Sequence, residues 1–214
     1  MVERLYGWQV RLLARLGVDV NKPDVHGRTP LMNCALVNDE RWGVGLARTL
    51  LEYGARSAVR DRLGFTALHH ACVRRRPALV GVLLAAADFD IRAVDRRGNS
   101  SLHYSAVMGD RVITSALLAV YRRYGFPVNA TNRANQTTLE FAYHNGHTDC
   151  AQMIGDVQEA ARSKAVDAKL SPDREQPSLG DGDSLGTTHA RTSASYRGVY
   201  THIIATEQWS VASG

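Results

Sequence analysis

The residues with the clearest potential for chemistry lie close together near the middle of the chain. His69, His70 and Cys72 fall within four residues, and imidazole and thiolate groups are ligands that zinc prefers. A structural zinc site usually takes its ligands from closely spaced pairs, however, and the 3 cysteines of the chain include no CxxC pair. We therefore expect neither a metal site nor a bound cofactor.

Catalytic motifs are missing from the sequence as well. It contains no GxSxG elbow, no glycine-rich phosphate loop and no HExxH zinc motif. Asp24, Asp61 and Asp95 recur along the chain, but each stands alone beside a turn, where a carboxylate oxygen can accept hydrogen bonds from backbone N–H groups. We expect a structural role for these aspartates and a protein that is not an enzyme.

Composition places the chain among folded, globular proteins. Hydrophobic residues make up 44% of the 214 residues and charged residues 22%, which excludes a wholly disordered chain. No apolar run approaches the roughly 18 residues of a membrane span, and Glu3, Arg11 and Arg15 interrupt the stretch where a signal peptide would be apolar. We therefore expect a cytoplasmic protein, with the nucleus as the alternative location.

A short motif that recurs four times is the strongest signal in the sequence. Each copy starts with Asp or Asn, has Gly or Asn at its fourth position, a hydroxyl residue at its sixth and Leu at its eighth: Asp24–Leu31, Asp61–Leu68, Asp95–Leu102 and Asn132–Leu139. The copies start 37, 34 and 37 residues apart, which is a period of about 33 residues with short insertions. We place these insertions at Asn38–Gly43 and near Tyr121–Pro127.

Each position of the motif has a physical reason. Gly and Asn tolerate the left-handed backbone of a tight turn, as expected at Gly27, Gly64, Gly98 and Asn135. A hydroxyl side chain caps a helix N-terminus, as expected at Thr29, Thr66, Ser100 and Thr137. Each unit then carries small side chains and, further on, an apolar second segment. The pattern predicts a turn, a helix, a short turn and an antiparallel helix in every unit.

This pattern resembles the ankyrin repeat, whose signature is Thr-Pro-Leu-His-x-Ala at a period near 33 residues. The best local match is Thr66–Ala71, and the resemblance covers roughly residues 5–156. It implies an all-α solenoid of stacked helix-turn-helix units with short hairpin loops. It also implies that His69 and His103 are structural and form hydrogen bonds between the loops of adjacent units. Met32 and Glu140 stand where the family has this histidine.

The resemblance divides the chain into a repeat domain, residues 1–156, and a tail, residues 157–214. The domain is expected to hold an N-terminal half-repeat at 5–21 and repeats at about 24–60, 61–94, 95–131 and 132–156. The half-repeat fits two situations equally, a cap on the stack or the remainder of a longer array. The tail is expected to start as a helix, Val157–Lys169, and then to be disordered. Tyr196–Trp209 is either a chance apolar patch or a short binding peptide.

Arginines near the turns are the most informative residues for function. They directly follow the recurrent Asp or Asn, or lie within the same turn: Arg28, Arg62, Arg96, Arg97 and Arg133. In stacked units about 10 Å apart these positions form a basic row along one edge. The resemblance implies that the turn tips and the exposed side of the first helices meet protein partners, which adds Phe65 as an exposed aromatic, Arg74 and Met108.

An arginine row beside apolar residues suits an acidic, partly apolar peptide. The alternative interpretation is that these arginines are solvated and bind no partner. The basic charge lies in the repeats, because residues 157–214 hold 6 basic and 7 acidic residues against a net charge of +5 for the chain. This density is far below that of a dedicated nucleic-acid binder, so nucleic acid is the least favoured partner. Arg74–Arg76 is expected to be a solvated turn rather than a nuclear import signal.

The sequence therefore predicts a non-enzymatic interaction module, a scaffold or adaptor, that binds a protein partner as a monomer. The partner would contact the concave face and the turn tips of the stacked repeats. The alternative is a regulatory or targeting segment of a larger enzyme, channel or ubiquitin-ligase subunit.

Overall fold

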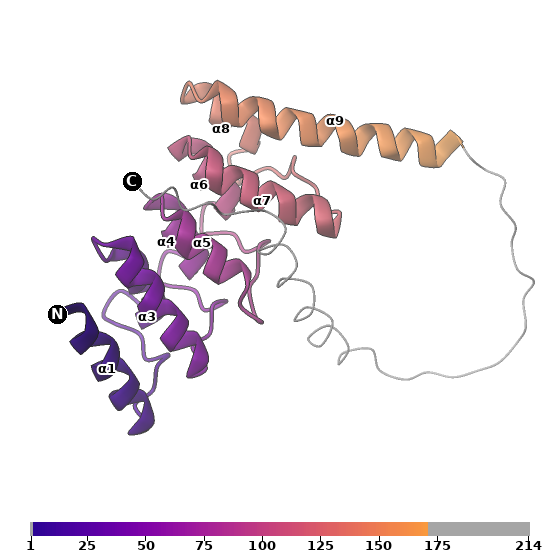
Figure 1. The fold of residues 1–214 in the computed structure, drawn as a ribbon. Helices are drawn as coiled ribbons and strands as arrows, with labels where there is room; N and C mark the ends of the chain where they lie inside the picture. The colour runs from indigo at the N-terminus through magenta and orange to yellow at the C-terminus, as the bar shows by residue number, and fades with distance from the viewer. Residues whose placement is uncertain (1, 171–214) are drawn as a thin grey trace, which may run out of the picture. The chain divides into compact units, whose positions relative to one another are not determined.

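The computed structural model describes residues 2–170, and side chains within residues 8–163. Its helices, shown in Figure 1, are α1 (Val2–Arg15), α2 (Pro30–Asn33), the 3₁₀ helix η1 (Cys34–Leu36), α3 (Glu40–Glu52), α4 (Ala67–Val73), α5 (Pro77–Leu84), α6 (Ser101–Met108), α7 (Arg111–Tyr124), α8 (Thr138–His144) and α9 (Thr148–Leu170). Strand pairing in this part of the chain is limited to the isolated bridges Val94–Ser100 and Thr131–Thr137. The expected all-α solenoid is confirmed.

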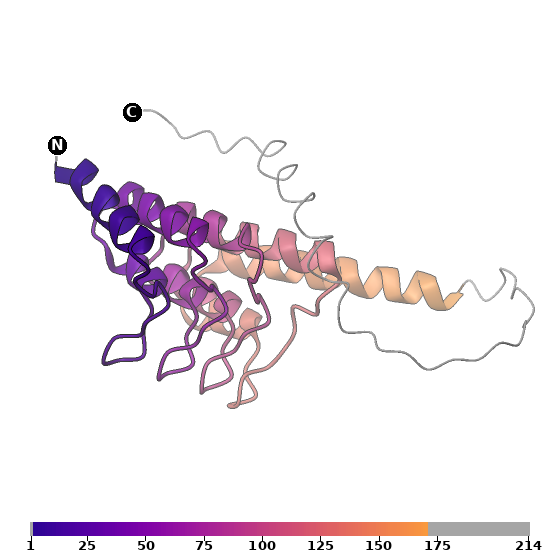
Figure 2. The same cartoon turned by 90° about the horizontal axis from the view of Figure 1, so that it is seen from below.

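The helices of the compact unit that runs to Val166 form two layers. The short first helices pack in series, α2 on α4, α4 on α6 and α6 on α8. The second helices pack in a parallel series, α1 on α3, α3 on α5 and α5 on α7, and each unit joins the two layers. The loops between units project on one side of the helices as a row of hairpins (Figure 2).

Buried leucines and alanines hold the layers together. Leu31, Leu68 and Leu102 start the first helices and are at most 5% exposed. Ala35, Ala71, Ala106 and Ala142 have no exposed surface, which confirms that small side chains let the helices approach closely. Leu83 and Leu117 on the second helices are likewise buried. Full burial of a leucine side chain contributes roughly 1.5–3 kcal/mol, so stability accumulates between neighbouring units.

Unit one has an interrupted first helix where the sequence predicts a continuous one. The chain forms one α-turn, α2, and then tightens into η1. In the next two units the capping hydroxyl and a histidine three residues later bond each other's backbone N–H groups. Met32 occupies the histidine position of unit one and has no acceptor to offer, and Thr29 Oγ1 lies 3.5 Å from the Met32 N–H. Unit one therefore lacks half of the cap.

Both expected insertions lengthen second helices. Asp39 accepts from the Arg41 N–H and starts α3 at Glu40, inside the first expected insertion. Helix α7 continues to Tyr124 and ends at Gly125, whose φ is +65°. A glycine with a left-handed backbone conformation commonly ends a helix. Gly43 and Tyr121 are the buried residues of the added turns.

The C-terminal unit ends in one long helix. The extension expected at Val157–Lys169 is part of α9, which starts at Thr148 and also forms the second helix of the last unit. The predicted domain boundary at residue 156 falls inside this helix and stays a prediction. The segment predicted to be disordered after it, and Tyr196–Trp209, lie outside the described residues. No helix in the described residues has the length and apolar character needed to cross a membrane.

Candidate partner-binding surface

Each hairpin loop, or tip, is closed by its first residue. Asp61 Oδ1 accepts from the N–H groups of Leu63 (2.8 Å) and Phe65 (2.9 Å), while the Asp61 N–H donates to the Phe65 carbonyl. The same two side-chain bonds recur in the other tips at Asp24, Asp95 and Asn132. These bonds confirm the structural role expected for the aspartates.

Glycine in the tips meets two requirements at once. Gly64 has a φ of +86°, and a Cβ atom there would lie 3.0 Å from the Arg96 backbone nitrogen of the next tip. Gly98 has a φ of +80°, and its Cβ would lie 2.8 Å from the Arg133 nitrogen. Asn135 keeps the left-handed backbone, with a φ of +58°, in the last tip of the described residues. No later tip is described there to crowd its side chain.

Backbone hydrogen bonds lock the tips to one another. The Arg62 N–H donates to the His26 carbonyl (3.2 Å), and the Arg96 N–H donates to the Leu63 carbonyl (3.0 Å). The Arg133 N–H donates to the Arg97 carbonyl (2.9 Å). Arg62, Arg96 and Arg133 are therefore fixed against the preceding tip through their backbone, and their side chains are exposed. Figure 2 shows the resulting row of loops.

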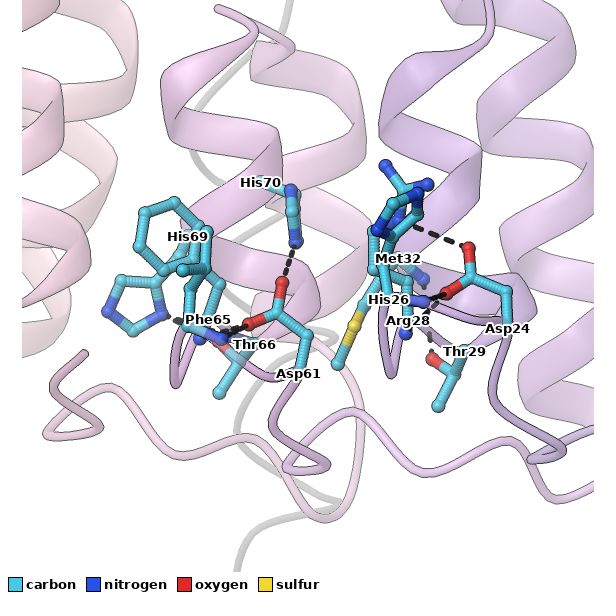
Figure 3. Close-up of polar contacts among 11 residues, drawn as sticks. Asp24, His26, Arg28, Thr29, Met32, Asp61, Phe65, Thr66, His69 and His70 are labelled. Atoms are coloured by element: carbon cyan, nitrogen blue, oxygen red, sulfur yellow. Dashed lines mark hydrogen bonds and ion pairs between the residues drawn. The ribbon is translucent and has the colours of Figure 1, made fainter. Parts of the chain in front are cut away.

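The second carboxylate oxygen ties two tips to their first helices, and Figure 3 shows the contact between Asp61 and His70. Asp61 Oδ2 lies 2.8 Å from His70 Nε2, and Asp95 Oδ2 accepts from the Tyr104 hydroxyl. Burial raises the pKa of Tyr104 to about 12, and its bond to Asp95 acts in the same direction. Tyr104 therefore stays a neutral donor. His70 and Tyr104 both stand four residues after the capping hydroxyl. This shared position in the repeat is the sequence signal that could have predicted their bonds to the aspartates.

The first tip uses its own arginine for this bond. Arg28 Nε lies 3.1 Å from Asp24 Oδ2 and forms an ion pair there (Figure 3). Burial alone would raise the pKa of Asp24, but N–H donors from Arg28 and His26 and the Arg28 guanidinium together hold it at about 2. Asp24 is consequently a carboxylate at neutral pH, and Arg28 is less free to meet a partner than the sequence suggests.

The histidines connect adjacent units as the resemblance implied. His69 Nδ1 accepts from the Thr66 N–H (3.2 Å), which leaves Nε2 to donate to the Asn99 carbonyl of the next unit (3.3 Å). His103 makes the equivalent contacts with Ser100 and with the Gln136 carbonyl. Burial lowers the pKa of His69 to about 4, so this imidazole is neutral at physiological pH. The tautomer follows from these partners.

His69, His70 and Cys72 do not converge on a common point. The two histidines bond Thr66 and Asp61 respectively, and Cys72 is buried with a pKa raised by desolvation. No group of three or more His, Cys, Asp or Glu side chains suited to a metal ion occurs among the described residues.

Four of the candidate arginines lie exposed on the tips. Among the described residues the side chains of Arg62, Arg96, Arg97 and Arg133 take part in no ion pair or hydrogen bond. We call this set the arginine row. Two apolar side chains continue it toward the N-terminal tips: Val25 is 75% exposed and Leu63 is 61% exposed.

Phe65 is not the exposed aromatic that we expected. Its ring is half-buried, with centroids 5.6 Å from His69, 5.3 Å from His70 and 5.1 Å from Tyr104. Aromatic neighbours at these distances fix the ring and shield it. The exposed apolar residue of this tip is Leu63, which precedes Gly64, whereas we expected it to be the residue that follows this glycine.

The remaining candidates lie at the ends of first helices. Arg74 is exposed at the C-terminus of α4, and Met108 is half-buried at the end of α6. Arg75 and Arg76 are not simply solvated, which corrects our expectation for this turn. Arg76 Nη2 donates to the Val37 carbonyl (2.7 Å), and Arg75 Nε lies 3.6 Å from Asp110 Oδ2. These two arginines tie unit two to its neighbours on either side.

Comparisons with known proteins agree with this architecture. A family model described as ankyrin repeats (3 copies) matches residues 7–95. Ankyrin repeat domain-containing protein 63 of Homo sapiens is 34% identical over 155 residues, which cover 71% of this chain and 40% of that protein. The protein of the same name from Mus musculus is 37% identical over 128 residues, or 60% of this chain and 33% of its own length. The chain thus spans well under half of these relatives.

Proposed function

The chain is built from ankyrin repeats, and on that premise we propose that it is a non-enzymatic adaptor that binds an acidic, partly apolar segment of a protein partner. Ankyrin repeats are, in general, a protein-interaction module. The observation that carries the proposal is the arginine row, four exposed guanidinium groups on tips that are locked in register.

The guanidinium donors of the row are available because the nearby aspartates bond other groups. Asp61 and Asp95 direct both carboxylate oxygens toward backbone N–H groups, His70 and Tyr104, and neither forms an ion pair with the arginines beside it. Arginine presents several donors in a planar fork that matches a carboxylate. A partner with Asp or Glu side chains supplies the missing charge.

Rigidity supports binding at such a surface. The tips are fixed by side-chain and backbone hydrogen bonds before any partner arrives, so little conformational entropy is lost on the side of this protein. Val25 and Leu63 add apolar surface at the end of the row where arginines are fewer. The half-buried Met108 and the exposed Arg74 extend the proposed surface onto the first helices.

The alternative function is a regulatory or targeting segment of a larger protein. The observation that favours it is the alignment with the human relative, which is matched over 40% of its length. In this alternative the larger protein is an enzyme, a channel or a ubiquitin-ligase subunit.

Charge reversal in the row tests the proposal. The probe is a fluorescent peptide of Glu and Leu residues, compared with the same peptide carrying Gln for Glu. The double variant Arg96→Glu/Arg133→Glu should weaken binding of the Glu peptide about tenfold, because two charge pairs are replaced by repulsion. Fluorescence anisotropy measures the affinity and thermal melting checks the fold, which should be unchanged.

The matched control is Arg48→Glu/Arg123→Glu, which changes the same charge on exposed positions of α3 and α7. This control should leave the affinity nearly unchanged. Equal losses in the two double variants would show only a nonspecific charge effect. Equal binding of the Gln peptide would also contradict the proposal.

A further inference from the structure

The spacing of the arginines restricts the conformation of the segment that they bind. Neighbouring first helices pack directly on one another, α4 on α6 and α6 on α8. Packed helices lie about 8–10 Å apart. Arg62, Arg96 and Arg133 occupy equivalent positions in three successive tips, so the row offers one equivalent arginine Cα about every 8–10 Å.

This spacing is set by backbone and not by flexible loops. The N–H groups of Arg96 and Arg133 bond the carbonyls of Leu63 and Arg97 in the preceding tips. Gly98 permits the second approach, because any Cβ at that position would contact the Arg133 nitrogen. The three Cα positions therefore cannot shift independently to fit a partner of another period.

Peptide conformations differ in the distance after which a side chain returns to the same face. A β-strand returns after two residues, or about 6.6–6.8 Å. An α-helix returns after seven residues, or about 10.5 Å. A polyproline II helix returns after three residues, or about 9.3 Å, and is the conformation whose repeat falls within the spacing of the tips.

We propose that the bound segment is an extended peptide in polyproline II conformation with an acidic residue at every third position. This inference rests on the proposed function and specifies the partner. Polyproline II leaves its backbone groups unpaired and its side chains on three faces, so one face meets the arginines while another stays in solvent. Such a segment needs about seven residues to place three carboxylates on three tips.

The first tip determines which end of the bound segment is apolar. Val25 stands where the other tips have arginine, and it is 75% exposed. The peptide residue that lies opposite Val25, three positions from the acidic residue that binds Arg62, is therefore apolar. Along the tips the segment carries one apolar residue followed by three acidic residues, all separated by two positions of any kind.

Spacing isomers of one peptide test this inference with the full-length chain. The probes are ten-residue fluorescent peptides of identical composition, with one Leu, three Glu and a Ser and Pro background. Two isomers carry period three, one in each chain direction, and others carry period two, period four or a cluster of Glu. One period-three isomer should bind about tenfold more tightly than the others, a difference that anisotropy resolves.

Pairwise substitution then checks the register. In the better isomer, Glu→Gln at the end far from Leu should weaken binding of the wild-type chain but not of Arg133→Gln. Substitution of the Glu nearest to Leu by Gln should instead weaken binding of the wild-type chain but not of Arg62→Gln. Arg48→Gln serves as the matched control and should show no such pairing with any position.

The outcomes separate this inference from the function on which it rests. Equal affinity of all Glu isomers, with continued dependence on the arginine row, would overturn the polyproline II register and leave the acidic partner in place. Failure of every Glu isomer to bind would overturn both. A Glu position that couples equally to all three arginines would also overturn the register.

Discussion

Gly98→Ala is the change that most sharply probes how the tips are held together. The methyl group would meet two obstacles, a left-handed backbone with a φ of +80° and the Arg133 nitrogen at 2.8 Å. The backbone conformation alone costs about 1–2 kcal/mol for a residue other than glycine. The contact forces the next tip away and weakens the bond from the Arg133 N–H to the Arg97 carbonyl, which adds about 1–3 kcal/mol.

Gly54→Ala is the matched control for this experiment. Gly54 has a φ of +85° after α3, but a Cβ there would have nothing within 4 Å. It therefore reports the backbone cost by itself, about 1–2 kcal/mol. Urea unfolding followed by circular dichroism should give a free energy of unfolding about 2 kcal/mol lower for Gly98→Ala than for Gly54→Ala.

Hydrogen exchange locates the damage. The Arg133 amide should exchange faster in Gly98→Ala. The Arg62 amide bonds the His26 carbonyl between the first two tips, away from the substitution, and should keep its protection. Equal free energies of unfolding for the two alanine variants would refute the claim that glycine is required for contact between tips.

Three further outcomes test the packing and the buried histidines. Leu117→Ala, at a side chain with no exposed surface, should lower the free energy of unfolding by about 2–5 kcal/mol, and a loss below about 0.5 kcal/mol in urea melts would contradict its role in the core. Leu83→Ala, at 1% exposure, should behave alike in the same assay. Burial lowers the pKa of His69 from 6.5 to about 4, so between these pH values the unfolded chain binds a proton at His69 that the folded chain does not. The free energy of unfolding should therefore be full above pH 6.5 and fall by up to about 3 kcal/mol as the pH drops toward 4. Urea melts of wild type and His69→Gln across this range measure it, and an unchanged slope in the variant would exclude His69 as the cause.

The sequence predicts the parts of the fold that each unit specifies by itself. The aspartate at the start of a tip, the left-handed fourth residue and the capping hydroxyl act within about ten residues, and the structure confirms them at Asp61, Gly64 and Thr66. The histidine contact to the next unit was also predicted, because it recurs once per repeat and the family resemblance carries it. Periodicity therefore reveals contacts that every unit repeats.

Contacts that occur once in the stack were not predictable in this way. The shielding of Phe65 depends on Tyr104 of the following unit, and the Arg76 bond depends on a carbonyl at Val37 of the preceding one. No local pattern indicates either partner. The exposed Leu63 was missed for a related reason, since its exposure follows from the path of the tip and not from its residue type.

The measurement that tests the central claim most directly is an NMR titration of the isotope-labelled chain with the period-three Glu peptide. Recognition by the arginine row predicts shifts of the backbone amides and side-chain Nε–H groups of Arg62, Arg96 and Arg133, with little change at Arg48 on α3. Shifts concentrated on the second helices, or absent from the tips at saturating peptide, would contradict the account.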